Sequence, residues 1–249
     1  MAFFDLPVGK EKAALWFLGQ SGFYFKCAKA TAVIDPYLSD SVGEATPPFS
    51  RAYPVPVAPQ EIQADIFIVT HDHLDHLDPQ TIRAYAYKEQ TQFVSPRHSA
   101  EKLVSLGVPQ KNVTVVDHGD QAVINGVKIQ GIFALGTGAD VVDTTGYKLT
   151  FENGKSVYHT SDTAFCQLLL DAAPSADVLL PVINGKFGNL GAEQAAALTK
   201  RVNPKFVIPH HYDVMALNSE NPQAFRYFCE ETGFGDRCVI LKPLEKFEW

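Results

Sequence analysis

The 249-residue chain has little cysteine, no excess of basic residues and no apolar run near the ~18 residues that a membrane span needs. Its four cysteines, Cys27, Cys166, Cys229 and Cys238, form no C-x-x-C pair. They are therefore expected to be free thiols in a reducing cytosol rather than a disulfide framework. A bridge between Cys229 and Cys238 is the alternative left open.

The charge balance argues against two classes of partner. With 21 Lys and Arg against 28 Asp and Glu, the formal net charge is −7, which disfavours a broad surface for nucleic acid or anionic membrane. Asp5, Lys10 and Glu11 precede any long apolar stretch, so the pattern of a signal peptide is missing. We therefore expect a cytoplasmic protein that associates with no membrane and acts on a small molecule.

Apolar residues make up 46% of the chain, which is enough for a sizeable core in one large domain. No linker, low-complexity tract or shift in composition divides the sequence. We therefore predict a single domain over residues 1–249.

Short apolar runs alternate with turn signals along the whole length. Strands are expected at 14–18, 23–25, 32–34, 65–70, 93–94, 113–116, 178–180, 206–208 and 239–241, and helices at 79–88, 97–106, 164–170, 192–201 and 222–232. Asn125-Gly126 and Asn153-Gly154 are typical of two-residue hairpin turns, whereas 37–59 reads as a long surface loop. Each half thus shows hairpin strands followed by strand–helix alternation, which predicts an α+β fold, a four-layer αββα sandwich with both sheets in the middle.

A dense run of metal-ligating residue types, His71-Asp72-His73-Leu74-Asp75-His76, follows the strand that ends at Thr70. His71 and His73 can point the same way from an extended turn, and Asp75 and His76 lie one turn further on. Imidazole nitrogens together with carboxylate oxygens suit Zn, Mn or Fe. The run predicts a divalent metal site, with a solvated His-rich loop as the alternative.

Two further strand ends carry the same residue types. Asp162 follows one strand, and its carboxylate can bridge two cations or instead support a neighbouring ligand or cap a helix. His211 follows another strand, as a ligand or as a hydrogen-bonded core residue, and for His210 the second role is favoured. These residues complete the candidate metal ligands.

The loop that begins Asn184-Gly185-Lys186 precedes a predicted helix. Its glycines allow close backbone approach, a helix N-terminus favours an anion, and Lys186 adds positive charge. We expect Asn184, Gly185 and Lys186 to contact an anionic substrate group such as a phosphate. A simple tight turn is the alternative.

Taken with WFLGQSG at 16–22 and IDPY at 34–37, these motifs run through nearly the whole chain. The chain resembles the metallo-β-lactamase-fold hydrolases and is similar to their L-ascorbate-6-phosphate lactonase-like group. The resemblance implies an αββα sandwich with one or two divalent metal ions at the sheet edges. It assigns His71 and His73 to one metal, Asp75 and His76 to the other, Asp162 as the bridge and His211 as the ligand that completes the second site.

The sequence departs from the family pattern at one ligand position. Where the family supplies a further His or Asp to the first metal, this chain has Gly136. Asp140 or Asp143 could reach in from the same loop, water could fill the position, or the first site could be weak or empty. One metal and two metals both stay open.

The resemblance favours metal-assisted hydrolysis of a small, anionic ester, lactone or phosphodiester, in the manner of a lactonase or phosphodiesterase. Asp75 or Asp162 would orient the activated water or move its proton, and Asp35 or His159 would orient a ligand imidazole. A superfamily nuclease is disfavoured because the chain leaves no room for a clamp domain. A non-catalytic metal- or ligand-binding protein of the same fold is the other alternative, and a homo-oligomer is left open.

Overall fold

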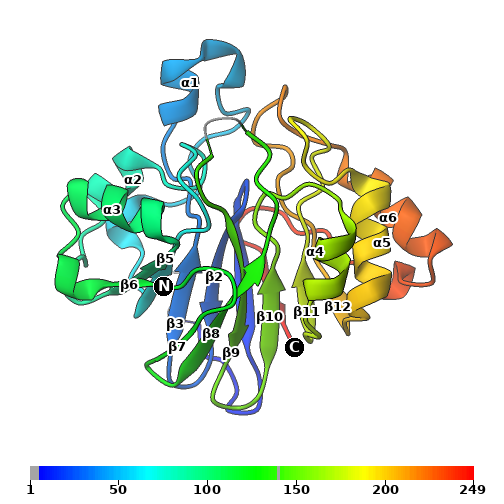
Figure 1. The fold of residues 1–249 in the computed structure, drawn as a ribbon, viewed down its shortest axis with the longest axis horizontal. Coiled ribbons are helices and arrows are strands. Elements are labelled where there is room, and N and C mark those ends of the chain that lie inside the picture. Colours follow the sequence, from blue (N-terminus) through cyan, green and yellow to red (C-terminus); the bar gives the residue numbers. More distant parts are fainter. Residues whose placement is uncertain (1–5, 139–140) are drawn as a thin grey trace.

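The computed structural model describes residues 6–138 and 141–249, in which two β-sheets lie face to face with helices on their outer sides (Figure 1). The first sheet has the order β13-β1-β2-β3-β4-β5-β6. Its strands are β1 (Ala14–Gly19), β2 (Gly22–Lys26), β3 (Thr31–Ile34), β4 (Ile66–Ile68), β5 (Gln92–Ser95), β6 (Val113–Val115) and β13 (Lys246–Glu248).

The second sheet has the order β12-β11-β10-β9-β8-β7. Its strands are β7 (Gln121–Ile124), β8 (Val127–Phe133), β9 (Thr145–Thr150), β10 (Ser156–His159), β11 (Val178–Leu180) and β12 (Phe206–Val207). The helices are α1 (Ser41–Ala45), α2 (Pro79–Ala84), α3 (Arg97–Ser105), α4 (Gln167–Ala172), α5 (Ala192–Val202) and α6 (Pro222–Glu231), with short 3-10 turns η2 (Pro47–Phe49), η3 (Pro59–Glu61), η4 (Gln110–Asn112) and η5 (Gly235–Arg237).

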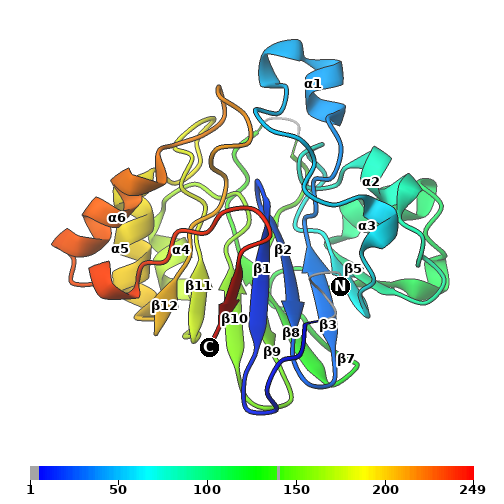
Figure 2. The same cartoon turned by 180° about the vertical axis from the view of Figure 1, so that it is seen from behind.

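Each sheet joins an antiparallel part to a parallel part. Strands β1 to β3 and β7 to β10 pair antiparallel, whereas β3 to β6 and β10 to β12 pair parallel. Parallel neighbours need crossover connections, and these place α2 and α3 outside the first sheet and α4 and α5 outside the second, where α6 lies beside α5 (Figures 1 and 2). The predicted αββα sandwich is confirmed.

Side-chain alternation on β1 shows where the core lies. Leu15 and Phe17 belong to the large core between the sheets, and Trp16 and Leu18 belong to the core between the first sheet and its helices. Successive side chains of a strand point to opposite faces, so a strand in the middle of this sandwich is apolar on both. This explains the uninterrupted apolar run at 14–18.

Two predicted helices are shorter than expected. The helix predicted over 79–88 ends at Ala84, because Tyr85 turns to extended backbone and packs its ring on Phe67. The helix predicted over 164–170 begins only at Gln167, because the Ala164 N–H donates to the carbonyl of Leu135 in a neighbouring loop. Residues 37–59 also differ from a plain loop, since they contain α1 and η2.

The predicted closing strand at 239–241 was wrong. Here the chain forms a single isolated bridge to β12, between Cys238 and Val207, with the Val239 N–H donating to the Val207 carbonyl, and the carbonyl of Leu241 accepts from the Tyr212 hydroxyl instead of from a strand. The last strand is β13, which pairs antiparallel with β1 at the edge of the first sheet.

The two predicted hairpins differ in their turns. Asn125 and Gly126 both have positive φ, at 50° and 79°, as a two-residue type I′ turn requires. In the second hairpin only Gly154 does, at 80°, and the Phe151 N–H donates to the Lys155 carbonyl. The prediction of a two-residue turn at Asn153-Gly154 was therefore wrong: the turn is longer, with Gly154 as its left-handed residue.

All four cysteines are free thiols, and the Cys229 thiol is hydrogen-bonded to Cys238 instead of bridged to it. Among the helices that the structure describes, none has the length and apolar character needed to cross a membrane.

At Gly131 in β8, two backbone segments pass too close together for a side chain to fit between them, and this provides a test of the packing. Its N–H donates to the Asp120 carbonyl, and a Cβ at this position would overlap the backbone carbonyl of Asp117. We expect Gly131→Ala to lower the free energy of unfolding by about 1–3 kcal/mol because the backbone must shift, measured by urea denaturation. Gly9→Ala, whose Cβ would only touch the Lys12 side chain at 3.9 Å, should stay within about 0.5 kcal/mol. Equal stability of the two variants would contradict this packing.

Candidate metal centre

The segments that follow β4, β10 and β12 meet at one edge of the sandwich, near the upper ends of the strands in Figure 1. Among the described residues they form two groups of side chains whose ligand atoms lie within 4.8 Å of one another in each group. The first group is His71, His73 and Asp162, and the second is Asp75, His76 and His211. All six residues predicted as metal ligands are thus brought together.

Local backbone geometry produces this convergence. His76 and Leu77 both donate their N–H groups to the His73 carbonyl, a turn that brings Asp75 and His76 back toward His71. His211 has φ 69° and donates its N–H to the Gln20 carbonyl at 2.7 Å. Residues other than glycine rarely adopt positive φ, and such strained positions cluster at functional sites.

Asp162 lies between the two groups. Its Oδ1 is 3.5 Å from His76 Nε2, and its Oδ2 is 3.5 Å from His211 Nε2. His211 Nε2 is also 3.3 Å from Asp75 Oδ2. Asp162 thus belongs to the first group and also contacts two members of the second, which is the position that a bridging ligand needs.

Burial and mutual charge set the protonation of these groups. Burial alone raises the pKa of Asp162, but His211 and His76 hold it well below its usual range. Burial lowers the pKa of His76, but Asp162, Asp75 and Asp35 raise it well above the ordinary value. In the same way the carboxylates raise the pKa of His211 to about 9 against the effect of burial. Without a metal, two imidazolium groups therefore balance the buried carboxylates.

His71 behaves differently from its neighbours. Burial, assisted by the positive charge of His76, lowers the pKa of His71 to about 3. Its ring is therefore neutral at physiological pH, the state that a metal ligand requires.

Two atoms that face each other at the centre fit a divalent cation. His76 Nε2 and Asp162 Oδ1 are buried and lie 3.5 Å apart, and among the described residues neither has a hydrogen-bond partner. Such orphaned buried atoms are rare in proteins. A cation would satisfy both, would suit the mixed nitrogen and oxygen donors, and would release the protons that His76 and His211 carry.

Asp35 orients His76 toward the centre. His76 Nδ1 donates to Asp35 Oδ2 at 2.7 Å, and the N–H and hydroxyl of Thr70 donate to the same carboxylate at 2.8 and 2.6 Å. Of the two orienting residues considered from the sequence, Asp35 therefore contacts a ligand imidazole. His159 lies deeper: its Nε2 donates to the Ser21 carbonyl, and its ring stacks on His210.

Sequence reasoning missed two side chains that hold the ligand carboxylates. Gln20 Nε2 donates to Asp75 Oδ2 at 2.8 Å, and Asn189 Nδ2 donates to Asp162 Oδ2 at 2.6 Å. In the sequence, each is only a polar residue in a glycine-flanked turn, after a strand for Gln20 and before a helix for Asn189. This is a weak signal for a site residue. Only the tertiary structure shows which turns reach the centre.

The residues predicted to bind substrate have different surroundings. Asn184 is buried and donates to Asn218 Oδ1 at 2.7 Å, which ties two loops of the site edge together. Gly185 has φ 60°, and Lys186 is exposed to solvent. His210 is buried outside both groups, with Nδ1 3.0 Å from the Ser21 hydroxyl.

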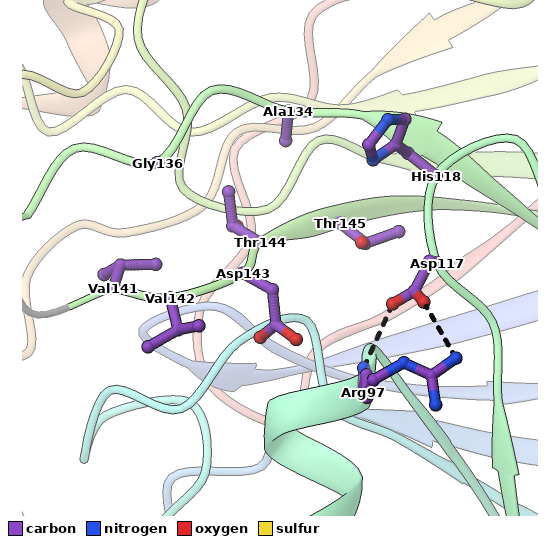
Figure 3. A pocket seen from close by; sticks show the side chains of 10 residues that line it. All are labelled: Arg97, Asp117, His118, Ala134, Gly136, Val141, Val142, Asp143, Thr144 and Thr145. Carbon is purple, nitrogen blue, oxygen red and sulfur yellow. Dashed lines mark hydrogen bonds and ion pairs between the residues drawn. The ribbon is translucent and has the colours of Figure 1, made fainter.

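No ligand replaces the side chain missing at Gly136 within the described residues. Asp143 turns toward α3, where its Oδ2 accepts from the His98 N–H at 2.7 Å, and it lines a cavity of about 520 Å³ with Arg97 and Gly136 (Figure 3). The suggestion that Asp143 completes the first group was therefore wrong. Asp140, the other residue considered, lies outside the described residues.

Comparison with known proteins adds an independent line of evidence. The family described as "Beta-lactamase superfamily domain" matches residues 14–211. The "UPF0173 metal-dependent hydrolase" of Hyperthermus butylicus is 27% identical over 235 residues, which span 93% of this chain and 97% of that one. The protein of the same name from Pelotomaculum thermopropionicum is 29% identical over 242 residues, or 93% and 98% of the two chains.

Solved structures share the fold at low identity. Igni18, a metallo hydrolase from Ignicoccus hospitalis, superposes with a TM-score of 0.77 at 22% identity, covering 96% of this chain and 98% of that one. A metallo-beta-lactamase fold protein from Bacillus subtilis gives 0.68 at 14% identity, covering 96% and 99%. An isothiocyanate hydrolase from Delia radicum gut bacteria gives 0.76 at 19% identity, covering 94% and 98%. The architecture is the metallo-β-lactamase fold.

The carboxylate of Asp35 provides a test of the centre. Asp35→Asn keeps the size of the side chain but removes the charge that orients His76, so we expect zinc affinity to fall about 10- to 100-fold. A competition titration with a chromophoric chelator measures this. Asp177→Asn is the matched control, because Asp177 pairs with Lys205 at the opposite end of β10. An equal loss in both variants would argue against the role given to Asp35.

Proposed function

The chain belongs to the beta-lactamase superfamily and is similar to proteins named metal-dependent hydrolases, and we propose that it uses an activated water to cleave a small anionic ester, lactone or phosphodiester. The observation that carries the proposal is the convergence of six buried or half-buried donor side chains, two of which, His76 and Asp162, have a ligand atom that forms no hydrogen bond within the described part of the chain. A solvated loop of histidines would not bury these atoms or support them with further carboxylate and amide contacts.

The two groups of donor side chains would bind separate cations, or one of them would bind the only cation. His71, His73 and Asp162 would hold one cation, and Asp75, His76 and His211 would hold another or the only one. A bound divalent cation would supply Lewis acidity and would lower the pKa of water to about 7, which would make a hydroxide nucleophile available near neutral pH.

Asp75 and Asp162 are best suited to orient the attacking water. Although burial opposes it, His76 holds the pKa of the Asp75 carboxyl well below its usual range, and His211 does the same for Asp162. Both are therefore ionised and accept a hydrogen bond from water, but neither retains a proton readily near neutral pH. We assign them orientation of the nucleophile, with the amides of Gln20 and Asn189 fixing the two carboxylates.

The loop at 184–190 supports an anionic substrate. Lys186 lies exposed on this loop, and Asn189 of the same loop binds Asp162. The backbone carbonyl of Lys186 accepts from the Asn189 N–H at 3.0 Å, so Lys186 is tied to the residue that contacts Asp162. Asn184 is buried and would position the loop, while the left-handed Gly185 permits its turn.

A non-catalytic metal-binding protein is the second candidate, and Gly136 is the observation in its favour. The second group of ligands argues against the non-catalytic candidate, because Asp75, His76 and His211 are all buried and are supported by Asp35 and Gln20. A site that no longer catalysed a reaction would not need further side chains to hold each of these ligands in place.

Metal removal separates the two candidates. We expect the purified protein to hydrolyse at least one member of a panel of esters, lactones and phosphodiesters, to lose this activity on chelation and to regain it with Zn, Mn or Fe(II). Asp75→Asn should lower kcat by at least about 10²-fold, because the water loses its orienting carboxylate. Stoichiometric metal together with no turnover on the whole panel would favour the non-catalytic protein.

Lys186 tests the charge of the substrate. Lys186→Ala should raise KM for an anionic substrate about two- to fivefold with kcat unchanged, because an exposed charge contributes only modestly to binding. The KM of a neutral analogue should not change. Lys111→Ala, which removes an exposed lysine next to Glu89, is the control. An unchanged KM for the anionic substrate would remove Lys186 from the site.

A further inference from the structure

Phe187 is a bulky aromatic residue held in an unusual position. It has φ 52°, a left-handed backbone that large side chains rarely adopt, and it lies between two further left-handed residues, Gly185 and Gly188. Its side chain is nevertheless 63% exposed. The strain is therefore not offset by burial of the ring in the core, and strain of this kind is typical of ligand-binding loops.

The loop that carries Phe187 is part of the metal centre. Two residues further on, Asn189 donates to the Asp162 carboxylate and accepts from the Thr137 hydroxyl at 3.1 Å. Phe187 itself lines a cavity of about 370 Å³ together with His73, Thr137 and Gly138. The ring thus shares an open space with a ligand of the first metal group.

A second aromatic ring reaches Phe187 from a distant segment. Phe49 in η2 lies with its ring centroid 6.0 Å from that of Phe187, at an interplanar angle of 46°. Phe49 is itself packed against a small cluster around Tyr37 and Val214. One ring is thus anchored and the other is exposed, so together they form an apolar wall beside the site.

Other exposed apolar side chains surround the same edge. Of the nine large apolar residues exposed in the described part of the chain, five lie on segments that follow β8, β10, β11 or β12, or that precede β9, at the edge of the metal centre. They are Leu135, Val142, Phe165, Phe187 and Leu217. Exposed apolar groups gathered around a polar centre indicate a binding site.

We infer that Phe187 and Phe49 form a subsite for an aryl or alkyl group of the substrate. The inference rests on the proposed function and narrows its substrate class to amphiphilic molecules. The hydrolysed group, with its negative charge, faces the metal ligands, and an apolar substituent packs against the two rings. Phe187 is in this view a specificity-determining residue, and purely polar substrates of similar size are poor ligands.

Two phosphonates that the enzyme cannot hydrolyse test the subsite without turnover. Methylphosphonate and benzylphosphonate share the anionic head group and differ in the phenyl ring. In calorimetric titrations of the zinc-loaded protein, we expect benzylphosphonate to bind at least about tenfold more tightly. Phe187→Ala should reduce this ratio to below about threefold while the Kd of methylphosphonate stays the same, and Phe187→Leu should retain most of it.

Tyr227→Ala is the matched control, because Tyr227 is an aromatic residue 55% exposed on α6, an outer helix. It should leave the ratio unchanged. The subsite is overturned if the wild type does not discriminate, if Phe187→Ala keeps the full ratio, or if neither phosphonate binds. The ratio of the two phosphonate affinities does not depend on hydrolysis. If that ratio depends on Phe187 but the protein turns over no substrate, the proposed function is refuted. If the protein does turn over a substrate but the ratio is near one, only this subsite is refuted.

Discussion

Three carboxylates, Asp35, Asp75 and Asp162, are buried together at one edge of the sandwich, and the surrounding structure depends on how their charge is neutralised. Burying an unpaired charge is costly, so each carboxylate must face a cation or a hydrogen-bond donor. His76 and His211 supply protons when no metal is present, and their ring nitrogens and the carboxylate oxygens are the donors that a divalent metal prefers. The same electrostatic requirement thus specifies a binding site for a cation.

The sandwich provides the rigidity for this arrangement. Two sheets bring the ends of β4, β10 and β12 to one edge, and short turns of strained backbone aim the ligands inward. Asp35, Gln20 and Asn189 then fix one ligand side chain each. Because these supports come from separate segments, His76, Asp75 and Asp162 are each held from outside their own loop, which is what a preorganised site requires.

The site is asymmetric in two respects. On the metal side, the second group is wholly buried, whereas the first includes the half-buried His73 and has only glycine at position 136. On the substrate side, the aromatic pair of Phe49 and Phe187 lies beside the first group. A less crowded first group next to an apolar wall leaves room for a ligand beside His73.

The sequence alone determined the fold class and the candidate ligands. Apolar runs of strand length, glycine-rich turns and the spacing of the H-x-H-x-D-H run are local features, and they predicted the αββα sandwich and four of the six residues that the structure gathers. Asp162 and His211 were candidates at two further strand ends, and the resemblance to the metallo-β-lactamase-fold hydrolases implied the full set. The sequence could not determine what depends on contacts between distant segments. The Gln20 and Asn189 amides reach their carboxylates across 55 and 27 residues, β13 replaces the expected strand at 239–241, and Asp143 turns to α3 instead of the metal. Such contacts follow from how the two sheets pack, because the packing decides which turns meet at the edge, and no local pattern encodes it.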